Sequence, residues 1–361
     1  MSTTQQTQYT ASHDLHQCAL KPIPKRTFEG KVSFDRQEIM LETEKYWANG
    51  TALKYYFYTA AGKASDVNGE LDLVRSAFDA WKNIGIGLSF KETTAPDEAH
   101  IRIAFMRGEG SWSYIGRDCL GIPTSDPTMN FGWNLLTDPR TVGVAIHEIG
   151  HAIGLPHEHQ NPNAGIVWNE QAVISAFSRP PNNWDEATIR NNILNKYTSG
   201  KIQGSEWDPR SIMEYAFEEG LIQLPKPYDV EGIHPPGNKL SDIDIAWTQR
   251  FYPALTEADL PELHIGASEP LDLDHGEQRS FKFSPKCTRQ YELRTFGECD
   301  GVLVVFEQHA ADGGEFLIGQ DDSGKEDNAH LKLRLEKNKT YHINFRMLFR
   351  NADATPSIML W

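Results

Sequence analysis

Residues 147–157 read HEIGHAIGLPH, and this stretch decides most of what the sequence indicates about the fold. On an α-helix, the spacing of His147 and His151 puts both imidazoles on one face, where they can bind the same ion. Glu148 follows the first histidine and can act on a metal-bound water. The glycine three residues after His151 can adopt a positive φ and end the helix, so that His157 returns as a third nitrogen ligand. Three histidines leave one open position on a tetrahedral zinc ion, which is the catalytic pattern.

An ordinary amphipathic helix with surface histidines is the alternative interpretation. A bare HExxH is only moderately specific, whereas the extended HExxHxxGxxH requires six fixed positions to coincide. A second motif supports the zinc site: residues 208–215 read DPRSIMEY, with Met213 in a Ser-Ile-Met-x-Tyr sequence. A lone methionine usually packs in a core, but this sequence context, downstream of the histidines, is typical of a methionine turn beneath a zinc ion.

The two motifs together resemble the metzincin metalloproteases, and within them the astacin group. Glu158 follows the third histidine, and Tyr215 lies two residues after the methionine. Residues 110–117, GSWSYIGR, resemble the astacin strand that normally contains Cys-Trp-Ser-Tyr. The resemblance extends over roughly residues 44–254. Ser111 replaces the expected cysteine, and residues 160–163 lack the usual arginine and acidic run, which indicates a divergent, astacin-like branch.

The resemblance implies an α+β fold: a zincin or metzincin protease domain at residues 41–254, with a twisted, mostly parallel sheet, an antiparallel edge strand and an active-site helix. Local patterns agree with a mixed domain. Apolar residues recur with helical spacing over residues 66–84, and residues 53–58 and 99–105 are typical of strands. Residues 129–133 predict a short strand before the zinc helix. We expect its residues to form the substrate-binding edge strand: Asn130, Phe131, Gly132 and Trp133.

The resemblance also implies the activity, that of a zinc metalloendopeptidase acting on protein or peptide substrates. One catalytic zinc ion would lie on His147, His151 and His157, with Glu148 as the general base. Tyr215 would be a fifth ligand at rest and would hydrogen-bond to the oxyanion during attack; a packed core tyrosine is its alternative. A zinc-containing binding module without turnover is the alternative function. The presence of Glu148 argues against it, because a pure binding site needs no general base.

The first 40 residues form a polar N-terminal arm with little periodicity, interpreted as a pro-segment that makes the protein a latent zymogen. Astacin pro-segments use an aspartate in a Phe-x-Gly-Asp stretch, but Lys31 stands at that position here. Cys18 is the candidate latency ligand, because a thiolate binds zinc well and the arm is long enough to cross the cleft. Asp14 is the second candidate. An uninvolved thiol in a loose tail is the alternative.

The last part of the chain changes pattern after a linker at residues 255–264. Short alternating segments separated by Gly, Asp and Asn predict a small all-β sandwich over residues 265–361, and this segment resembles the PPC-type domains of secreted peptidases. An acidic turn in it offers oxygen ligands for calcium; a solvated turn is the alternative. The candidate calcium ligands are Asp321, Asp322 and Asp327.

The net charge of −15 argues against nucleic-acid binding, and no apolar run is long enough to span a membrane. Four cysteines do not make a disulfide framework. Cys287 and Cys299 are close enough in sequence to pair across a hairpin, and a reduced pair is the equal alternative. The opening residues contain no conventional signal peptide. Export without a leader, or with a leader outside this sequence, is favoured over a cytoplasmic location. We expect a monomer.

Overall fold

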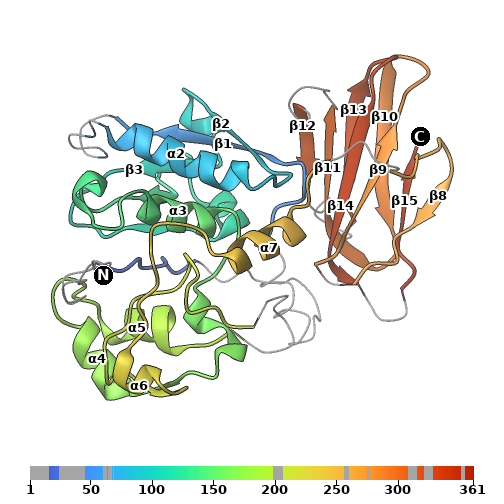
Figure 1. Cartoon of the computed structure of the whole chain (residues 1–361). Helices are drawn as coiled ribbons and strands as arrows, with labels where there is room; N and C mark the ends of the chain where they lie inside the picture. Colours follow the sequence, from blue (N-terminus) through green and yellow to red (C-terminus); the bar gives the residue numbers. More distant parts are fainter. Residues whose placement is uncertain are drawn as a thin grey trace, which may run out of the picture.

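The computed structural model describes most of the chain, which folds into a mixed α/β part followed by an all-β part (Figure 1). The described residues are 16–23, 45–59, 63, 67, 69–197, 206–255, 260–274, 276–307, 315–320, 328–350 and 354–361. Within them, no helix is long and apolar enough to cross a membrane. The predicted division at residues 255–264 is compatible with this arrangement and stays a prediction.

A five-stranded sheet organises the first part, in the order β2-β1-β3-β5-β4. Neighbouring strands β2, β1, β3 and β5 run parallel, and β4 pairs antiparallel with β5. The predicted mostly parallel sheet with one antiparallel edge strand is therefore confirmed. The strands are β1 (Ala52–Phe57), β2 (Ser89–Glu92), β3 (Ile101–Ala104), β4 (Trp112–Ser113) and β5 (Met129–Asn130).

The prediction that residues 130–133 form the edge of this sheet is wrong. β5 covers only Met129–Asn130 and lies between β3 and β4. The edge strand is β4, at Trp112–Ser113. The pattern along a segment indicates that it is a strand, but the neighbours of that strand depend on how the chain folds back. Here β4, which precedes β5 in the chain, turns back to pair along its outer side. Phe131, Gly132 and Trp133 follow the strand as a loop.

Two helices, α2 (Glu70–Asn83) and α3 (Val142–Ala152), pack against each other beside the sheet (Figure 1). Trp81 of α2 donates from Nε1 to the Ile146 carbonyl of α3 at 2.9 Å. Every residue of α3 from Gly143 to Ala152 is buried. Since α3 is enclosed on all sides, polar side chains on it must find partners inside the protein.

A smaller lobe lies on the other side of arm residues 16–23, which Figure 1 shows in blue between α3 and α5 (Glu186–Ile189). Its apolar core includes Phe217, Ile189 and, from the arm, Cys18. Helix α7 (Asp242–Phe251) follows this lobe, and its N-cap Ser241 forms a capping box with Asp244. The elements after α3 are β6 (Val167–Trp168), α4 (Glu170–Phe177), α5 (Glu186–Ile189), a π-helical turn (Arg190–Leu194), β7 (Ile222–Leu224), α6 (Tyr228–Glu231) and α7 (Asp242–Phe251). Short 3-10 helices occupy Pro96–Glu98, Gly116–Gly121, Leu135–Thr137, Glu158–Gln160 and Pro162–Ala164.

The last part is a sandwich of two four-stranded antiparallel sheets, as predicted, ordered β13-β10-β15-β8 and β12-β11-β14-β9. Apolar side chains from both sheets form its core. Its strands are β8 (Ser268–Pro270), β9 (Gln278–Phe283), β10 (Arg289–Phe296), β11 (Cys299–Glu307), β12 (Glu315–Gln320), β13 (His330–Leu335), β14 (Tyr341–Arg350) and β15 (Ser357–Leu360). Cys287 and Cys299 are both free thiols. The candidate calcium ligands Asp321, Asp322 and Asp327 lie outside the described residues.

Candidate metal centre

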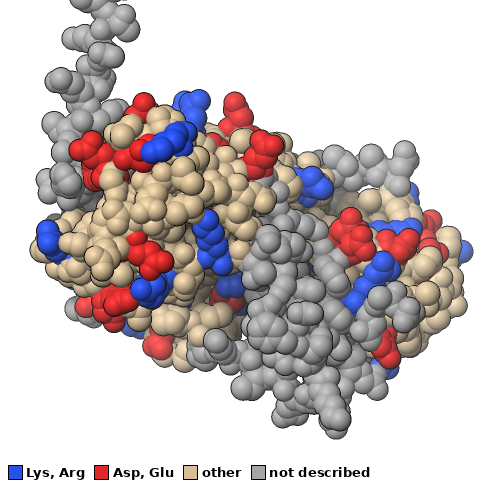
Figure 2. All heavy atoms as spheres, turned by 90° about the horizontal axis from the view of Figure 1, so that it is seen from below, with Lys and Arg blue, Asp and Glu red and all other residues tan. Residues whose placement is uncertain are grey.

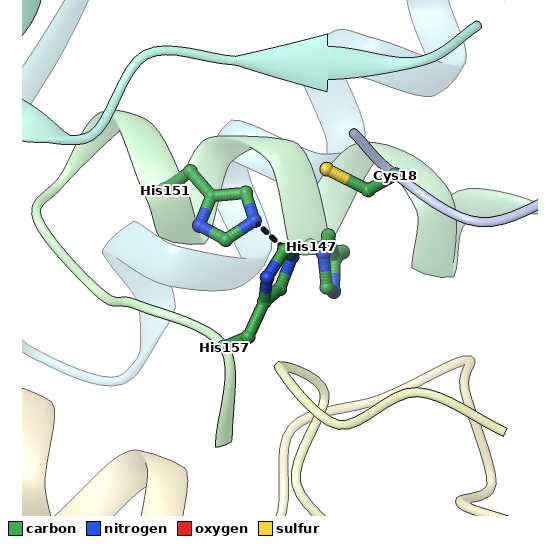
Figure 3. A group of neighbouring side chains, drawn as sticks. All are labelled: Cys18, His147, His151 and His157. Atoms are coloured by element: carbon green, nitrogen blue, oxygen red, sulfur yellow. Dashed lines mark hydrogen bonds between the residues drawn. The ribbon is translucent and has the colours of Figure 1, made fainter. Parts of the chain in front are cut away.

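Helix α3 carries His147 and His151 on one face, and the turn after it delivers His157. Gly154 has a φ of 109°, the positive value that lets the chain reverse at this point. The structure also brings Cys18 to the same place. One ligand atom from each of Cys18, His147, His151 and His157 lies within 4.8 Å of the others. Figure 3 shows the four side chains converging from α3, the following turn and the arm.

Main-chain carbonyls orient two of the imidazoles. His147 Nδ1 donates to the Ile212 carbonyl at 2.7 Å, and His151 Nδ1 donates to the Leu155 carbonyl at 2.7 Å. Each bond fixes the tautomer and leaves the Nε2 lone pair directed into the cluster. The Nε2 atoms of His151 and His157 are 3.0 Å apart. That separation is close to the roughly 3.3 Å edge expected for a tetrahedron with metal–nitrogen bonds of about 2.0 Å.

Burial also keeps these histidines in the neutral form that binds metal. It lowers the pKa of His147 to about 4, and it lowers the pKa values of His151 and His157 well below the usual range. Among the described residues, the buried Nε2 of His147 has no hydrogen-bond partner. A buried imidazole nitrogen without a partner is costly unless it coordinates an ion. The donor set, its neutral state and this nitrogen therefore fit a zinc ion.

Glu148 is fully buried beside the cluster. Burial raises the pKa of its carboxyl group to about 8, and the hydrogen bond from Cys18 opposes that rise. The Cys18 thiol donates from Sγ to Glu148 Oε2 over 3.4 Å. The carboxylate thus lies within reach of a group held at the three histidines, which is the position a general base requires.

Met213 lies against α3 at Gly150, and both residues are buried. A Cβ built on Gly150 would lie 2.4 Å from Met213 Sδ, so only glycine permits this close approach. The turn is tied to the segment after the third histidine as well, because Glu158 N donates to the Met213 carbonyl at 3.0 Å. The methionine turn therefore supports both the helix and the returning segment.

The comparison with family models matches this architecture. The model described as "Astacin", which represents a peptidase family, matches residues 39–222, or half of the chain. The chain belongs to the astacin family. "Protein SpAN" of Strongylocentrotus purpuratus is 31% identical over 159 residues, covering 42% of this chain and 22% of that protein. "Bone morphogenetic protein 1" of Xenopus laevis is 27% identical over 218 residues, covering 58% of this chain and 27% of that protein.

A solved structure of myroilysin is similar as well, with 29% identity and a TM-score of 0.51. It covers 58% of this chain and 96% of the myroilysin chain. This chain thus spans about a quarter of the length of those two curated relatives, but nearly all of the myroilysin chain.

In this astacin, Tyr215 lies beside the cluster and is 2% exposed. Its ring centroid is 4.4 Å from that of His157 and 6.2 Å from that of His147. Its hydroxyl donates to the main-chain carbonyl of Cys18. The tyrosine therefore contacts the arm here, and its predicted roles as metal ligand and oxyanion donor stay predictions.

The docked part of the arm, residues 16–23, lies between the two lobes (Figure 1), and its residues Gln17 and Cys18 are buried. Sequence reasoning identified Cys18 but missed the residues that hold the arm. Asn182 Oδ1 accepts a hydrogen bond from Gln17 N at 3.0 Å, and Asn192 Oδ1 accepts one from Leu20 N at 2.8 Å. No local pattern distinguishes these asparagines from those of ordinary turns. Asp14, the second latency candidate, lies outside the described residues.

Glu158, the residue after the third histidine, forms its side-chain hydrogen bonds with residues outside the cluster. Its Oε1 accepts the Asp208 N–H at 3.0 Å and the Asn161 side-chain amide at 3.2 Å. Burial raises the pKa of this carboxyl group to about 8. In the described structure Glu158 thus links the third-histidine segment to the start of the methionine turn.

Proposed function

We propose that this astacin is a zinc-dependent endopeptidase whose ion is held by His147, His151 and His157. The observation that carries the proposal is the convergence of these three neutral imidazoles on one point beside the buried carboxylate of Glu148. Membership of a peptidase family agrees with it. A zinc-binding module without turnover would not require a carboxylate at that position, so the arrangement favours catalysis.

Each side chain has a distinct task in this proposal. When bound, zinc polarises the substrate carbonyl and lowers the pKa of a water molecule. Glu148 accepts the proton of the attacking water and delivers it to the leaving amine. The Tyr215 hydroxyl, once released from the arm, donates a hydrogen bond to the oxygen on which negative charge develops. Met213 and the two carbonyls behind the histidines hold the imidazoles in place.

The same proposal includes latency: the N-terminal arm makes the protein a zymogen, with Cys18 as the blocking ligand. Its sulfur lies in the histidine cluster, and its carbonyl engages the Tyr215 hydroxyl. One residue of the arm therefore engages both the metal position and the oxyanion donor. Being tethered, it acts at a high effective concentration, and removal of the arm frees both groups together.

Protein or peptide chains are the proposed substrates, and nucleic acid is not. Acidic and basic side chains alternate over the described part of the face in Figure 2, rather than gathering into one basic patch. The outer edge of β4 offers main-chain groups to a peptide once the arm is removed. In the intact chain, Ala19 N of the arm donates to the Ser111 carbonyl at 3.1 Å next to β4. We further propose a secreted monomer.

Replacement of Cys18 by alanine tests both the peptidase activity and the latency. Intact Cys18→Ala protein, loaded with zinc, should cleave casein from time zero, whereas the intact wild type should be slow until its arm is cut. A chelator should abolish the activity of Cys18→Ala and that of the cut wild type. The matched control is Cys119→Ala, which removes another buried thiol outside the cluster and should stay latent. Equal initial rates for Cys18→Ala and the wild type would refute latency. A zinc-loaded Cys18→Ala protein and cut wild type that are both inactive would refute the peptidase assignment.

A further inference from the structure

Residues 16–23 of the arm are held between the two lobes through main-chain groups that any peptide possesses. Ala19 N donates to the Ser111 carbonyl beside β4, and the N–H groups of Gln17 and Leu20 donate to asparagine side chains of the opposite lobe. Because these bonds do not depend on side-chain identity, they position a peptide without selecting it. Selection must come from contacts with side chains.

Several described arm residues have such contacts: Cys18 donates to Glu148, and Lys21 Nζ lies 4.2 Å from the Trp112 ring centroid. His16 has the contact that selects for a planar ring. The His16 ring stacks on the Trp133 indole with centroids 4.8 Å apart and planes inclined by 20°. The carbonyl of the same residue accepts a hydrogen bond from Arg140 Nη2 at 2.9 Å. His16 is therefore recognised at two points, by an aromatic face for its ring and by a guanidinium for its main chain.

Asp138 holds both recognition groups in place. Its Oδ2 accepts from Trp133 Nε1 at 2.8 Å and from Arg140 Nη2 at 2.8 Å, and its Oδ1 accepts from Arg140 Nε at 3.0 Å. The Asp138 side chain is 5% exposed and that of Arg140 is 21% exposed. These bonds lie within the catalytic domain and do not involve the arm. The indole and the guanidinium therefore keep their orientation when the arm leaves.

We propose that Trp133, Arg140 and Asp138 form a substrate subsite for a residue with a planar ring side chain, on the His16 side of the metal cluster. Trp133 supplies the stacking face, Arg140 binds the main-chain carbonyl of that residue, and Asp138 is a positioning residue. The arm uses the subsite during latency, and an aromatic or histidine side chain of a peptide substrate occupies it afterwards. This inference rests on the proposed function for its substrate, but the subsite itself can be measured without turnover.

The first experiment uses the intact chain and follows the alkylation rate of Cys18 by iodoacetamide with mass spectrometry. His16→Phe should protect Cys18 at least as well as the wild type. His16→Leu should expose it about two- to twelvefold faster, the range that aromatic pairing supports beyond burial of area. In a Trp133→Leu background the difference between Phe and Leu should disappear, and Trp133→Phe should restore it. If the Cys18 alkylation rates of His16→Phe and His16→Leu differ by the same factor with and without Trp133, the proposed subsite is overturned.

The second experiment addresses peptides, using the full-length Cys18→Ala, Glu148→Gln double variant, which binds without turnover. Calorimetry compares peptides that carry phenylalanine or cyclohexylalanine at each of six positions. Because the arm competes equally with both peptides, the ratio of their affinities is unaffected by it. At one position the phenylalanine peptide should bind about two- to twelvefold tighter, and Trp133→Leu should remove that preference. Equal affinities at every position would overturn the inference. Casein cleavage by Cys18→Ala tests the proposed function separately, so the two failures are distinguishable.

Discussion

Glu148 shows how one residue depends on its surroundings for its chemistry. On the surface a glutamate carboxyl group titrates near 4.3 and is a weak base, but here burial raises its pKa to about 8. With the arm bound, the carboxylate accepts a hydrogen bond from the Cys18 thiol. A bound zinc ion opposes the rise, because a nearby positive charge favours the carboxylate. The surroundings of Glu148 therefore set the pKa of its carboxyl group more than the intrinsic acidity of a glutamate does.

Glu148→Gln is expected to retain about one zinc ion per chain and to lose at least about 100-fold in activity, because an amide cannot accept the proton of water. Zinc content by mass spectrometry and peptide cleavage, both measured in the Cys18→Ala background, check this. His151→Ala is the contrasting variant and should lose the metal itself. Activity of Glu148→Gln at the parent level would contradict its role as base.

Tyr215→Phe should keep zinc and reduce kcat by about 100-fold with little change in KM, because its hydrogen bond forms mainly in the transition state. The measurement again needs the Cys18→Ala background, since the same hydroxyl also holds the arm. Tyr58→Phe removes a hydroxyl that donates to the Thr124 carbonyl and should leave kcat unchanged. Wild-type kinetics for Tyr215→Phe would remove it from the mechanism.

Among the elements, α3 and the methionine turn are placed by contact rather than by their own propensities. Helix α3 has no side-chain hydrogen bond at its N-cap, since Thr141 has a φ of 51°. Its position comes from enclosure: Trp81 donates to the Ile146 carbonyl, and Met213 packs on Gly150. A glycine inside a helix costs about 1 kcal/mol relative to alanine, and here that cost permits the turn to approach the helix.

Gly150→Ala therefore should destabilise the protein, although alanine is the better helix former. The new Cβ would meet Met213 Sδ at 2.4 Å, and overpacking of this kind costs about 1–3 kcal/mol. Urea unfolding of the zinc-loaded protein measures the loss. Gly121→Ala is the matched control, because a Cβ there meets nothing within 4 Å. A more stable Gly150→Ala variant would mean that the turn moves away without cost.

At the scale of the whole molecule, residues 46–50 of the mixed α/β part contact the sandwich. Arg346, which is buried, donates from Nη1 to the Trp47 carbonyl at 3.5 Å, and its guanidinium lies 5.0 Å from the Tyr46 ring centroid. Trp47 in turn donates from Nε1 to the Ala152 carbonyl, at the end of α3, at 2.9 Å. The sandwich thus connects through this segment to the helix that carries two of the histidines. A second connection runs from Gln278 of β9 to the Phe251 carbonyl, and the neighbouring Tyr252 hydroxyl donates to the Ile153 carbonyl.

Gly50→Ala should weaken this junction. The residue has a φ of 89°, and a Cβ there would lie 2.3 Å from Phe306 Cε1 of the sandwich. Gly85→Ala is the matched control, with a φ of 84° and nothing within 4 Å, so it reports the backbone strain alone. Gly50→Ala should cost about 1–3 kcal/mol more than the control in urea unfolding. Adding Phe306→Ala should remove that excess. An equal loss in the free energy of unfolding for Gly50→Ala and Gly85→Ala would show that Phe306 moves aside without cost.

The sequence by itself determined the metal chemistry, because ligand spacing on a helix is a local property. His147, His151 and Glu148 follow from a helical period, and His157 follows from one glycine turn. The sandwich was predictable for the same reason, since alternation within each strand reports a buried face. Cys18 was identified by its residue type.

Only the tertiary structure decided which segments meet. It placed β4, instead of residues 130–133, at the edge of the sheet. It also brought Trp133, Asp138 and Arg140 against His16 of the arm, and Arg346 against Trp47. These contacts join residues that are far apart in the chain, and each side chain would be equally compatible with an exposed loop. Their positions depend on how the apolar surfaces of the lobes and the sandwich are buried together, which no local pattern encodes.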